Sequence, residues 1–171
     1  EEAGTAQLTA AQWTALRFFA RANRASRTPS AFASFQATTR GTASQTLKTL
    51  ETRGLLERRR CDSDGRSVRL EVTEAGRAML TGDPLRHLSG AIDVLAPDER
   101  DALGRALPDL VARLAALRGA EGIGTCDSCT HYEADHTAPG PGGYCACVAM
   151  SLAPFEIGLL CTRHSPRAAA G

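Results

Sequence analysis

The hydrophobic positions near the start of the chain recur at the period of a helix. One apolar stripe runs from Leu8 to Arg21, where Thr9 is a suitable N-cap residue. A second helical stretch follows the turn-like segment 27–30. A third stripe has positions four and three residues apart, and Gly54 provides a natural end for that helix. Its members are Ala43, Leu47 and Leu50. The pattern predicts three short helices in succession.

After Gly54 the pattern changes to that of strands. The apolar positions of SVRLEV alternate with charged residues, and LLERR has a similar character. The turn-rich segment CDSDGR separates the two. We therefore expect a β-hairpin with a charged tip, followed by a helix over residues 74–80.

The next segment has leucines at the spacing of a helix–helix seam. The first stripe contains Leu85, Leu88, Ile92 and Leu95. A second stripe follows the helix-start signal APDE and contains Leu103, Leu107, Leu110, Leu114 and Leu117. Such helices pack either inward as core or against a second copy of the chain, and we favour the second copy.

Charge is distributed unevenly along the 171 residues. The whole chain carries a formal charge of +1. Between Arg21 and Arg77, however, twelve Lys and Arg residues face six Asp and Glu residues, so this segment is +6 and the remainder is −5. Because binding to phosphates depends on the local charge cluster, the near-neutral total does not argue against DNA as a partner.

Helix, turn, helix and a charged hairpin form the order of a winged helix-turn-helix. The DNA major groove is about 12 Å wide and favours short hydroxyl and amide side chains near the start of a recognition helix. Arginines on a wing can enter a minor groove or pair with phosphate, and Asp64 is placed to hold Arg66 extended. The candidate DNA-binding residues on this reasoning are Thr42, Ser44, Gln45, Lys48, Arg58, Arg60, Asp64 and Arg66.

Three segments in series resemble the MarR family of dimeric winged-helix transcriptional regulators. They are LTAAQWTALRFF, TTRGTASQTLKTLETRGLLERR and DGRSVRLEVTEAG, within a resemblance over roughly residues 8–118. The resemblance implies that residues from Gly41 to Thr49 read the major groove, adds Thr39 and Arg40 at the start of this helix, and makes Asp64 and Arg66 the wing pair. It also implies a homodimer on double-stranded DNA. We expect the helix that usually precedes this region in the family to be absent or truncated.

The end of the chain contains five of the six cysteines. They occur as Cys126-x2-Cys129, Cys145-x-Cys147 and Cys161-x2-His164. The start of the sequence lacks a secretory signal, which predicts a cytoplasmic protein, and in a reducing cytosol such a cluster is more typical of a metal site than of disulfides. The segment is rich in Gly and Pro and has too few apolar residues to fold by burial alone. We therefore predict a metal-binding extension.

Some MarR-like regulators carry a similar extension, with C-x2-C, one later Cys before a Leu segment, and a closing C-x2-H. This resemblance implies the ligands Cys126, Cys129, Cys145 and Cys161, with Cys147 and His164 in reserve. We favour an iron–sulfur cluster, because clusters tolerate singly placed ligands and an oxidisable centre gives a regulator something to sense. Zinc is the alternative, since Cys145-x-Cys147 would supply a second closely spaced pair.

The expected fold is mainly α with a small β-hairpin wing. We divide the chain into a winged helix-turn-helix DNA-binding domain (1–80), dimerisation helices (81–118) and a cysteine-rich metal-binding extension (119–171). The sequence has no apolar stretch of about 18 residues and no recognisable catalytic motif, so we expect neither a membrane protein nor an enzyme.

The leading hypothesis is a sequence-specific transcriptional regulator whose DNA affinity is modulated by a redox-sensitive, cysteine-ligated metal centre. One alternative is a MarR-like repressor that responds to a small aromatic or phenolic molecule and has a purely structural zinc tail. Another is a redox or electron-transfer protein in which the helices are only a scaffold. The +6 segment argues against this last alternative.

Overall fold

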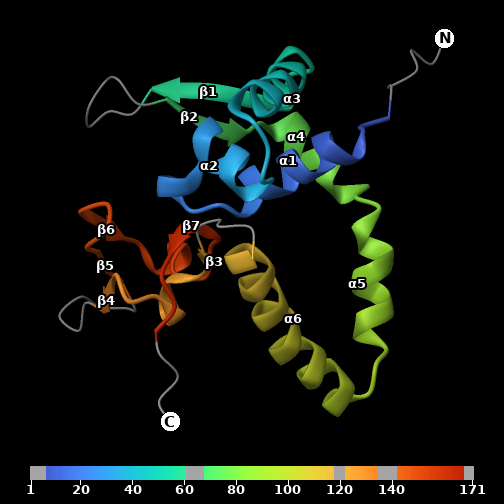
Figure 1. Cartoon of the computed structure of the whole chain (residues 1–171). Helices are drawn as coiled ribbons and strands as arrows, with labels where there is room; N and C mark the ends of the chain where they lie inside the picture. The colour runs from blue at the N-terminus through green and yellow to red at the C-terminus, as the bar shows by residue number, and fades with distance from the viewer. Residues whose placement is uncertain (1–6, 61–67, 118–121, 135–141, 168–171) are drawn as a thin grey trace.

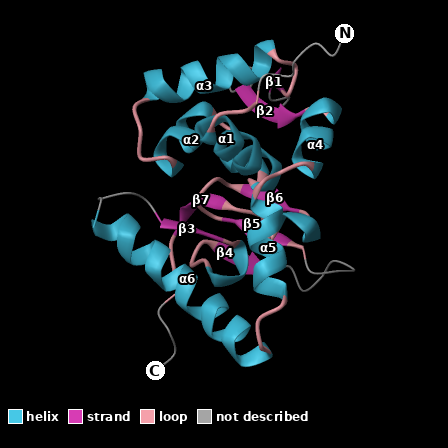
Figure 2. Cartoon of the chain, turned by 90° about the vertical axis from the view of Figure 1, so that its right-hand side faces the viewer, coloured by secondary structure: helices cyan, strands magenta, loops and turns pink. Residues whose placement is uncertain are grey.

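The structure, a computed structural model, describes residues 7–60, 68–117, 122–134 and 142–167. A helical domain with a two-stranded hairpin comes first, and a pair of long helices extends away from it (Figure 1). A tail of short strands then lies between the second long helix and the first domain, as both views show (Figures 1 and 2). No helix among the described residues combines the length and apolar character needed to cross a membrane.

The three predicted helices at the start of the chain are confirmed. They are α1 (Ala10–Arg21), α2 (Pro29–Phe35) and α3 (Arg40–Thr52), with a 3-10 turn, η1 (Arg24–Ser26), between the first two. Each helix begins at a threonine whose hydroxyl accepts a hydrogen bond from a backbone N–H of the first turn. These threonines are Thr9, Thr28 and Thr39. Gly54 has a φ of +68°, and this left-handed residue ends α3 as predicted.

The predicted hairpin is also confirmed. Strands β1 (Leu56–Arg60) and β2 (Val68–Val72) pair antiparallel, with Leu56 opposite Val72. Its tip, with Cys61, Asp64 and Arg66, lies outside the described residues. Helix α4 (Glu74–Thr81) follows, and a Cβ at Gly76 would clash with the carbonyl oxygen of Leu55. The close approach of α4 to the start of the hairpin therefore requires glycine at this position.

The core of the first domain forms where the three helices meet the hairpin. The predicted stripe of α3 is buried, and Leu70 of β2 belongs to the same core cluster. Phe18 and Phe19 of α1 pack edge to face with ring centroids 5.1 Å apart, and both contact Phe32 of α2. This core holds α3 in place while leaving its other side free.

Helices α5 (Leu85–Asp93) and α6 (Pro97–Leu117) contribute nothing to this core. None of their residues, all of which are described, is buried. The exposed large apolar side chains on and between them are Leu85, Leu88, Val94, Leu95, Leu107, Leu110, Val111, Leu114 and Leu117. The two leucine stripes are therefore not inward core within a single chain.

The tail consists of two small antiparallel sheets. Strand β3 (Gly122–Gly124) pairs with β7 (Cys161–His164). Strands β4 (Tyr132–Ala134), β5 (Gly143–Cys145) and β6 (Met150–Leu152) form a three-stranded meander. The turns η2 (Cys126–Ser128) and η3 (Pro154–Glu156) connect these elements. Strands of three or four residues supply little stability of their own, so the tail depends on other contacts.

Candidate DNA-binding surface and cysteine cluster

The exposed side of α3 carries the predicted recognition residues. Thr42, Ser44, Gln45 and Lys48 are all exposed, opposite the buried stripe, and Arg40 and Gly41 are exposed in the first turn. Thr39 is the N-cap, and its hydroxyl lies 2.9 Å from that of Thr42. The side chains of Ser44, Gln45 and Lys48 make no hydrogen bond with any described residue. They are therefore available for an external partner.

The arginines of β1 point to two different sides of the hairpin. Arg58 and Arg60 share one face, and Nε of Arg58 lies 2.8 Å from Oε1 of Glu51 in α3. Arg59 points the other way, where its hydrogen bond with Glu57 raises the pKa of the guanidinium. The predicted residues Arg58 and Arg60 thus lie on the side of the wing that adjoins the recognition helix, although Arg58 already has a carboxylate partner.

Four of the cysteines come together in the tail from three separate segments. Cys126 begins η2 and Cys129 follows it, while Cys145 ends β5 and Cys161 begins β7. The pairing of Gly124 with Cys161 brings β7 beside the chain that leads into Cys126. Cys126, Cys129 and Cys161 are buried and Cys145 is half-buried, and all four are free thiols.

The ionisation of Cys126 reports on its surroundings. Burial is the main reason why the pKa of this thiol is raised to about 11, and the nearby groups of Cys161, Cys145, Cys129 and Asp127 contribute to the rise. The three cysteines among these residues are the other members of the predicted ligand set. The backbone N–H of Arg163 also donates a hydrogen bond to Sγ of Cys161 at 3.4 Å.

The two reserve ligands have other surroundings. Cys147 is exposed, and Nε2 of His164 lies 3.0 Å from the hydroxyl of Ser128. Within the described part of the chain, no group of three or more Cys, His, Asp or Glu side chains is arranged to hold a metal ion as it stands.

The tail contacts the first domain through backbone hydrogen bonds. Leu160 donates to the carbonyl of Arg21 at 2.9 Å and accepts from the N–H of Asn23 at 2.8 Å. One residue beyond Cys161, the N–H of Thr162 donates to the hydroxyl of Ser26 in η1 at 3.1 Å. Both Ser26 and Thr162 are buried, with exposed fractions of 1% and 4%. Because water is excluded, loss of these bonds would leave polar groups unsatisfied.

A second contact to η1 is ionic. The guanidinium of Arg24 donates to the carbonyl of Ser151 at 2.8 Å and lies 3.2 Å from Oε2 of Glu156. The carboxylate of Glu156 is almost fully buried in the tail and also accepts from the N–H of Ala153. This contact was not predicted from the sequence, because Arg24 and Glu156 are 132 positions apart.

The docked turn is itself joined to the wing. The carbonyl of Arg27, next to Ser26, accepts a hydrogen bond from the N–H of Leu70 in β2 at 2.8 Å. Two residues further on, Pro29 begins α2. A short covalent and hydrogen-bonded path thus leads from Cys161 to β2 and to the start of α2.

A three-helix domain with an exposed third helix and a two-stranded hairpin defines a winged helix-turn-helix protein, the class that reads DNA with its third helix. Residues 6–67 match the model of the MarR family, so this domain of the chain is a MarR-type winged helix. The match does not extend over α4, α5, α6 or the tail.

Several solved structures resemble the chain. The chain is 26% identical to FabT of Streptococcus pneumoniae in complex with DNA, over 65% of this chain and 78% of that one, with a TM-score of 0.50. It resembles the transcriptional regulator SlyA in fold, at 20% identity over 66% and 80% of the two chains, with a TM-score of 0.52. The repressor CouR bound to a 23-mer DNA duplex is 33% identical over 61% and 75%, with a TM-score of 0.48. No curated protein sequence matches the chain.

Proposed function

We propose that this MarR-type regulator binds duplex DNA as a homodimer and that its DNA affinity depends on a metal centre held by Cys126, Cys129, Cys145 and Cys161. The observation that carries the proposal is the position of these four thiols. They come together in a tail that is hydrogen-bonded to η1, one residue away from the ligand candidate Cys161. Binding or loss of a metal at these thiols would therefore take place next to the DNA-binding domain.

The donor set fits a soft metal. Four thiols without disulfides suit either an iron–sulfur cluster or zinc, and closely placed thiolates repel one another unless a cation neutralises them. The short strands of the tail also bury few apolar side chains, so ligation would supply much of its folding free energy. The described side chains do not form a metal site as they stand, so metal binding would require them to move. We favour iron–sulfur, whose oxidation state would supply the redox sensitivity.

The DNA-facing part of the proposal rests on α3 and the wing. Gln45 and Ser44 carry the groups that reach base edges, while Lys48, Arg40 and Arg60 suit phosphates. A homodimer follows from α5 and α6, because exposed leucines in such number are covered in a stable regulator. Two-fold symmetry would then place two copies of α3 one helical turn of DNA apart.

Metal analysis with a visible absorption spectrum tests the metal assignment. Protein purified without oxygen should contain iron and sulfide and absorb in the visible range, whereas a colourless protein with stoichiometric zinc would favour the alternative. Cys161→Ser should lose the metal. Cys147→Ser is the matched control, because this exposed thiol lies outside the proposed set and should leave metal content unchanged. A wild-type protein that contains neither iron nor zinc would contradict the proposal.

A second candidate function has its own observation. A cavity of about 410 Å³ lies between α1, α4 and α5, where Arg21 and Arg86 lie beside Leu88 and Ile92, and where Arg17 is paired with Asp83. Apolar walls with a few cations suit a small aromatic or phenolic anion. In that case a ligand in this cavity would control DNA binding, and the cysteine tail would be a structural zinc site. Titration of metal-depleted protein with phenolic acids, followed by DNA affinity, separates the two functions.

A further inference from the structure

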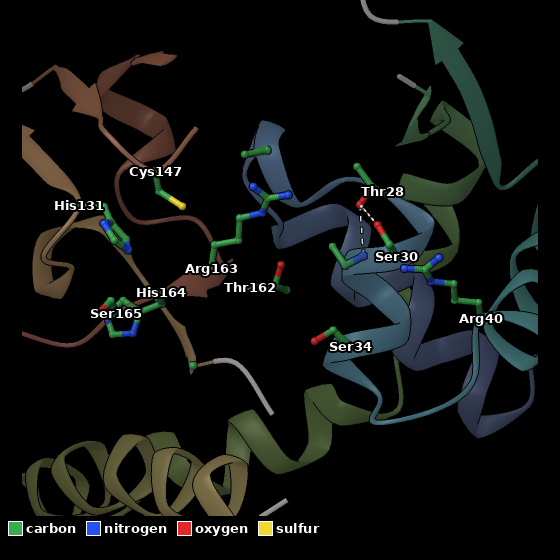
Figure 3. A pocket seen from close by; sticks show the side chains of 13 residues that line it. Thr28, Ser30, Ser34, Arg40, His131, Cys147, Thr162, Arg163, His164 and Ser165 are labelled. Atoms are coloured by element: carbon green, nitrogen blue, oxygen red, sulfur yellow. Dashed lines mark hydrogen bonds between the residues drawn. The ribbon is translucent and has the colours of Figure 1, made fainter. Parts of the chain in front are cut away.

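A polar cleft lies between the helical domain and the tail (Figure 3). Its volume is about 680 Å³, within the usual range of roughly 300–1,000 Å³ for small-molecule sites. One wall is formed by α2 and the start of α3, and the other by β7 and its neighbouring turns. The cleft is separate from the cavity beside α5 and from the four clustered cysteines.

The lining of this cleft is suited to an anion. Arg40 and Arg163 contribute guanidinium groups from opposite walls (Figure 3). The other polar side chains are hydroxyls, imidazoles and one thiol, namely Thr28, Ser30, Ser34, Thr162, Ser165, His131, His164 and Cys147. Among the described residues that line the cleft, none is Asp or Glu. Hydrogen-bond donors and positive charge therefore have no internal carboxylate to neutralise them.

The two guanidinium groups have no partner of their own in the described structure. Neither Arg40 nor Arg163 makes a side-chain hydrogen bond or ion pair with a described residue. Nearby arginines differ in this respect, since Arg24 pairs with Glu156, and Arg167 donates to the carbonyls of Cys129 and Tyr132. A guanidinium is always charged and its planar donors match phosphate oxygens.

We propose that this cleft binds phosphate groups, with Arg163 of the tail and Arg40 of the recognition helix as its charged residues. The hydroxyls of Thr28 and Ser30, 3.1 Å apart at the start of α2, provide further donors. The phosphate comes either from a small phosphorylated molecule or from the DNA backbone, because Arg40 also opens α3. Only the second source rests on the proposed function.

The small-molecule source is tested by calorimetric titration of the full chain with inorganic pyrophosphate at constant ionic strength. Wild type should bind, and both Arg163→Ala and Arg40→Ala should weaken binding by roughly tenfold or more, as expected for a lost charge-assisted hydrogen bond. Arg163→Lys should retain part of the affinity. Arg105→Ala is the matched control, since Arg105 is an exposed arginine of α6 outside the cleft.

The backbone source is tested with a random-sequence 40-base-pair duplex. If DNA phosphates occupy the cleft, Arg163→Ala should lower the magnitude of the slope of log K against log salt by about 0.9, while Arg105→Ala should not. If Arg163→Ala loses pyrophosphate binding but keeps the wild-type salt slope, the cleft binds a small phosphorylated molecule and not the DNA backbone. Unchanged pyrophosphate binding and an unchanged slope in both cleft variants would overturn the proposal.

Two further measurements distinguish loss of phosphate binding from unfolding of the tail. Metal content and far-ultraviolet circular dichroism of Arg163→Ala report whether the tail stays folded, and Arg40→Ala alters the opposite wall without touching the tail. A wild-type protein that binds no duplex at all would contradict the proposed function, while the pyrophosphate titration would still decide the cleft.

Discussion

Some side chains on α3 already have hydrogen-bond partners within the protein, and others have none among the described residues. The hydroxyl of Thr39 caps the helix and lies close to that of Thr42, so both have local hydrogen-bond partners. Gln45 and Lys48 point to solvent without a described partner. An amide that is unpaired in the free protein loses no internal bond when it meets a base edge, which makes Gln45 the best candidate for direct readout.

We predict that Gln45→Ala relaxes sequence preference. It should cost about 1–3 kcal/mol at an operator selected by the protein from a random pool, with little loss on unrelated DNA. Lys48→Ala should instead lower the affinity for all DNA duplexes alike, because a phosphate contact carries no sequence information. Thr52→Ala, at the far end of α3, serves as the control. Unchanged operator affinity in both Gln45→Ala and Lys48→Ala would show that α3 is not the reader.

Asp83 is the other residue with a clear energetic role. Its carboxylate receives two hydrogen bonds from Arg17, of 2.6 and 2.7 Å, and accepts one from the N–H of Leu85 at the start of α5. The hydrogen bond with Arg17 is the main reason why the pKa of Asp83 lies below its ordinary value of 3.8. The ion pair of Arg17 and Asp83 joins α1 of the winged domain to the start of α5.

We predict that Asp83→Asn destabilises the protein in a pH-dependent manner. Because the folded-state pKa is lowered, the carboxylate stabilises the fold fully above the ordinary value of 3.8 and loses this effect as the pH falls through the lower folded value. The variant should therefore be about 1.5–3 kcal/mol less stable at pH 7, the range for hydrogen bonds to charged groups. Urea unfolding should show a smaller difference near pH 3, and an equal difference at both pH values would refute this account.

At the scale of elements, the sequence predicts local structure well and long-range contacts poorly. The α3 stripe, the threonine cap of α1 and the strand period of the wing are local patterns, and each is confirmed. The contact between Ser26 and Thr162 spans 136 positions and has no period, motif or paired charge run that would announce it. The set of four thiols was implied by the resemblance to regulators with a similar extension, but the elements that carry them, and the contact of β7 with η1, are apparent only in the fold.

Helix α6 offers the clearest test at this scale. Leu110 is 53% exposed in the middle of its leucine stripe. We predict that Leu110→Glu converts a dimer into monomers, because a carboxylate would be buried without a partner at the two-fold interface. Arg105→Glu places the same group outside the stripe and should leave the dimer intact. Light scattering at micromolar concentration measures both, and a monomeric wild type would contradict the interface.

At the scale of the whole molecule, the tail contacts the DNA-binding domain directly. It follows α6, so in the proposed dimer it would influence how two chains are held, and it is also bonded to the turn between α1 and α2. The second contact continues to β2 and to the start of α2, the elements that pack beside the proposed recognition helix. Coupling between metal and DNA must be reciprocal, so a metal that favours DNA binding is itself retained more strongly on DNA.

We predict that Ser26→Ala weakens this coupling. The change removes the acceptor of the Thr162 N–H in a buried contact, which should loosen the tail from η1 while leaving the cysteines in place. Ser151→Ala is the matched control, because Ser151 contacts Arg24 through its backbone carbonyl and not its hydroxyl. The ratio of DNA affinities with and without metal should shrink in Ser26→Ala and stay as in wild type in Ser151→Ala. If the ratio of DNA affinities equals that of wild type in both variants, the contact between Ser26 and Thr162 does not carry the coupling.

The affinity of metal-loaded and metal-free wild type for one selected operator, at matched salt, tests the central claim most directly. We predict that removal of the metal lowers the affinity roughly tenfold, a coupling of about 1.4 kcal/mol that lies within the usual range for linked sites. Cys161→Ser should behave like the metal-free protein. Equal affinity of the loaded and the metal-free protein would contradict the account and leave the cysteines a purely structural role.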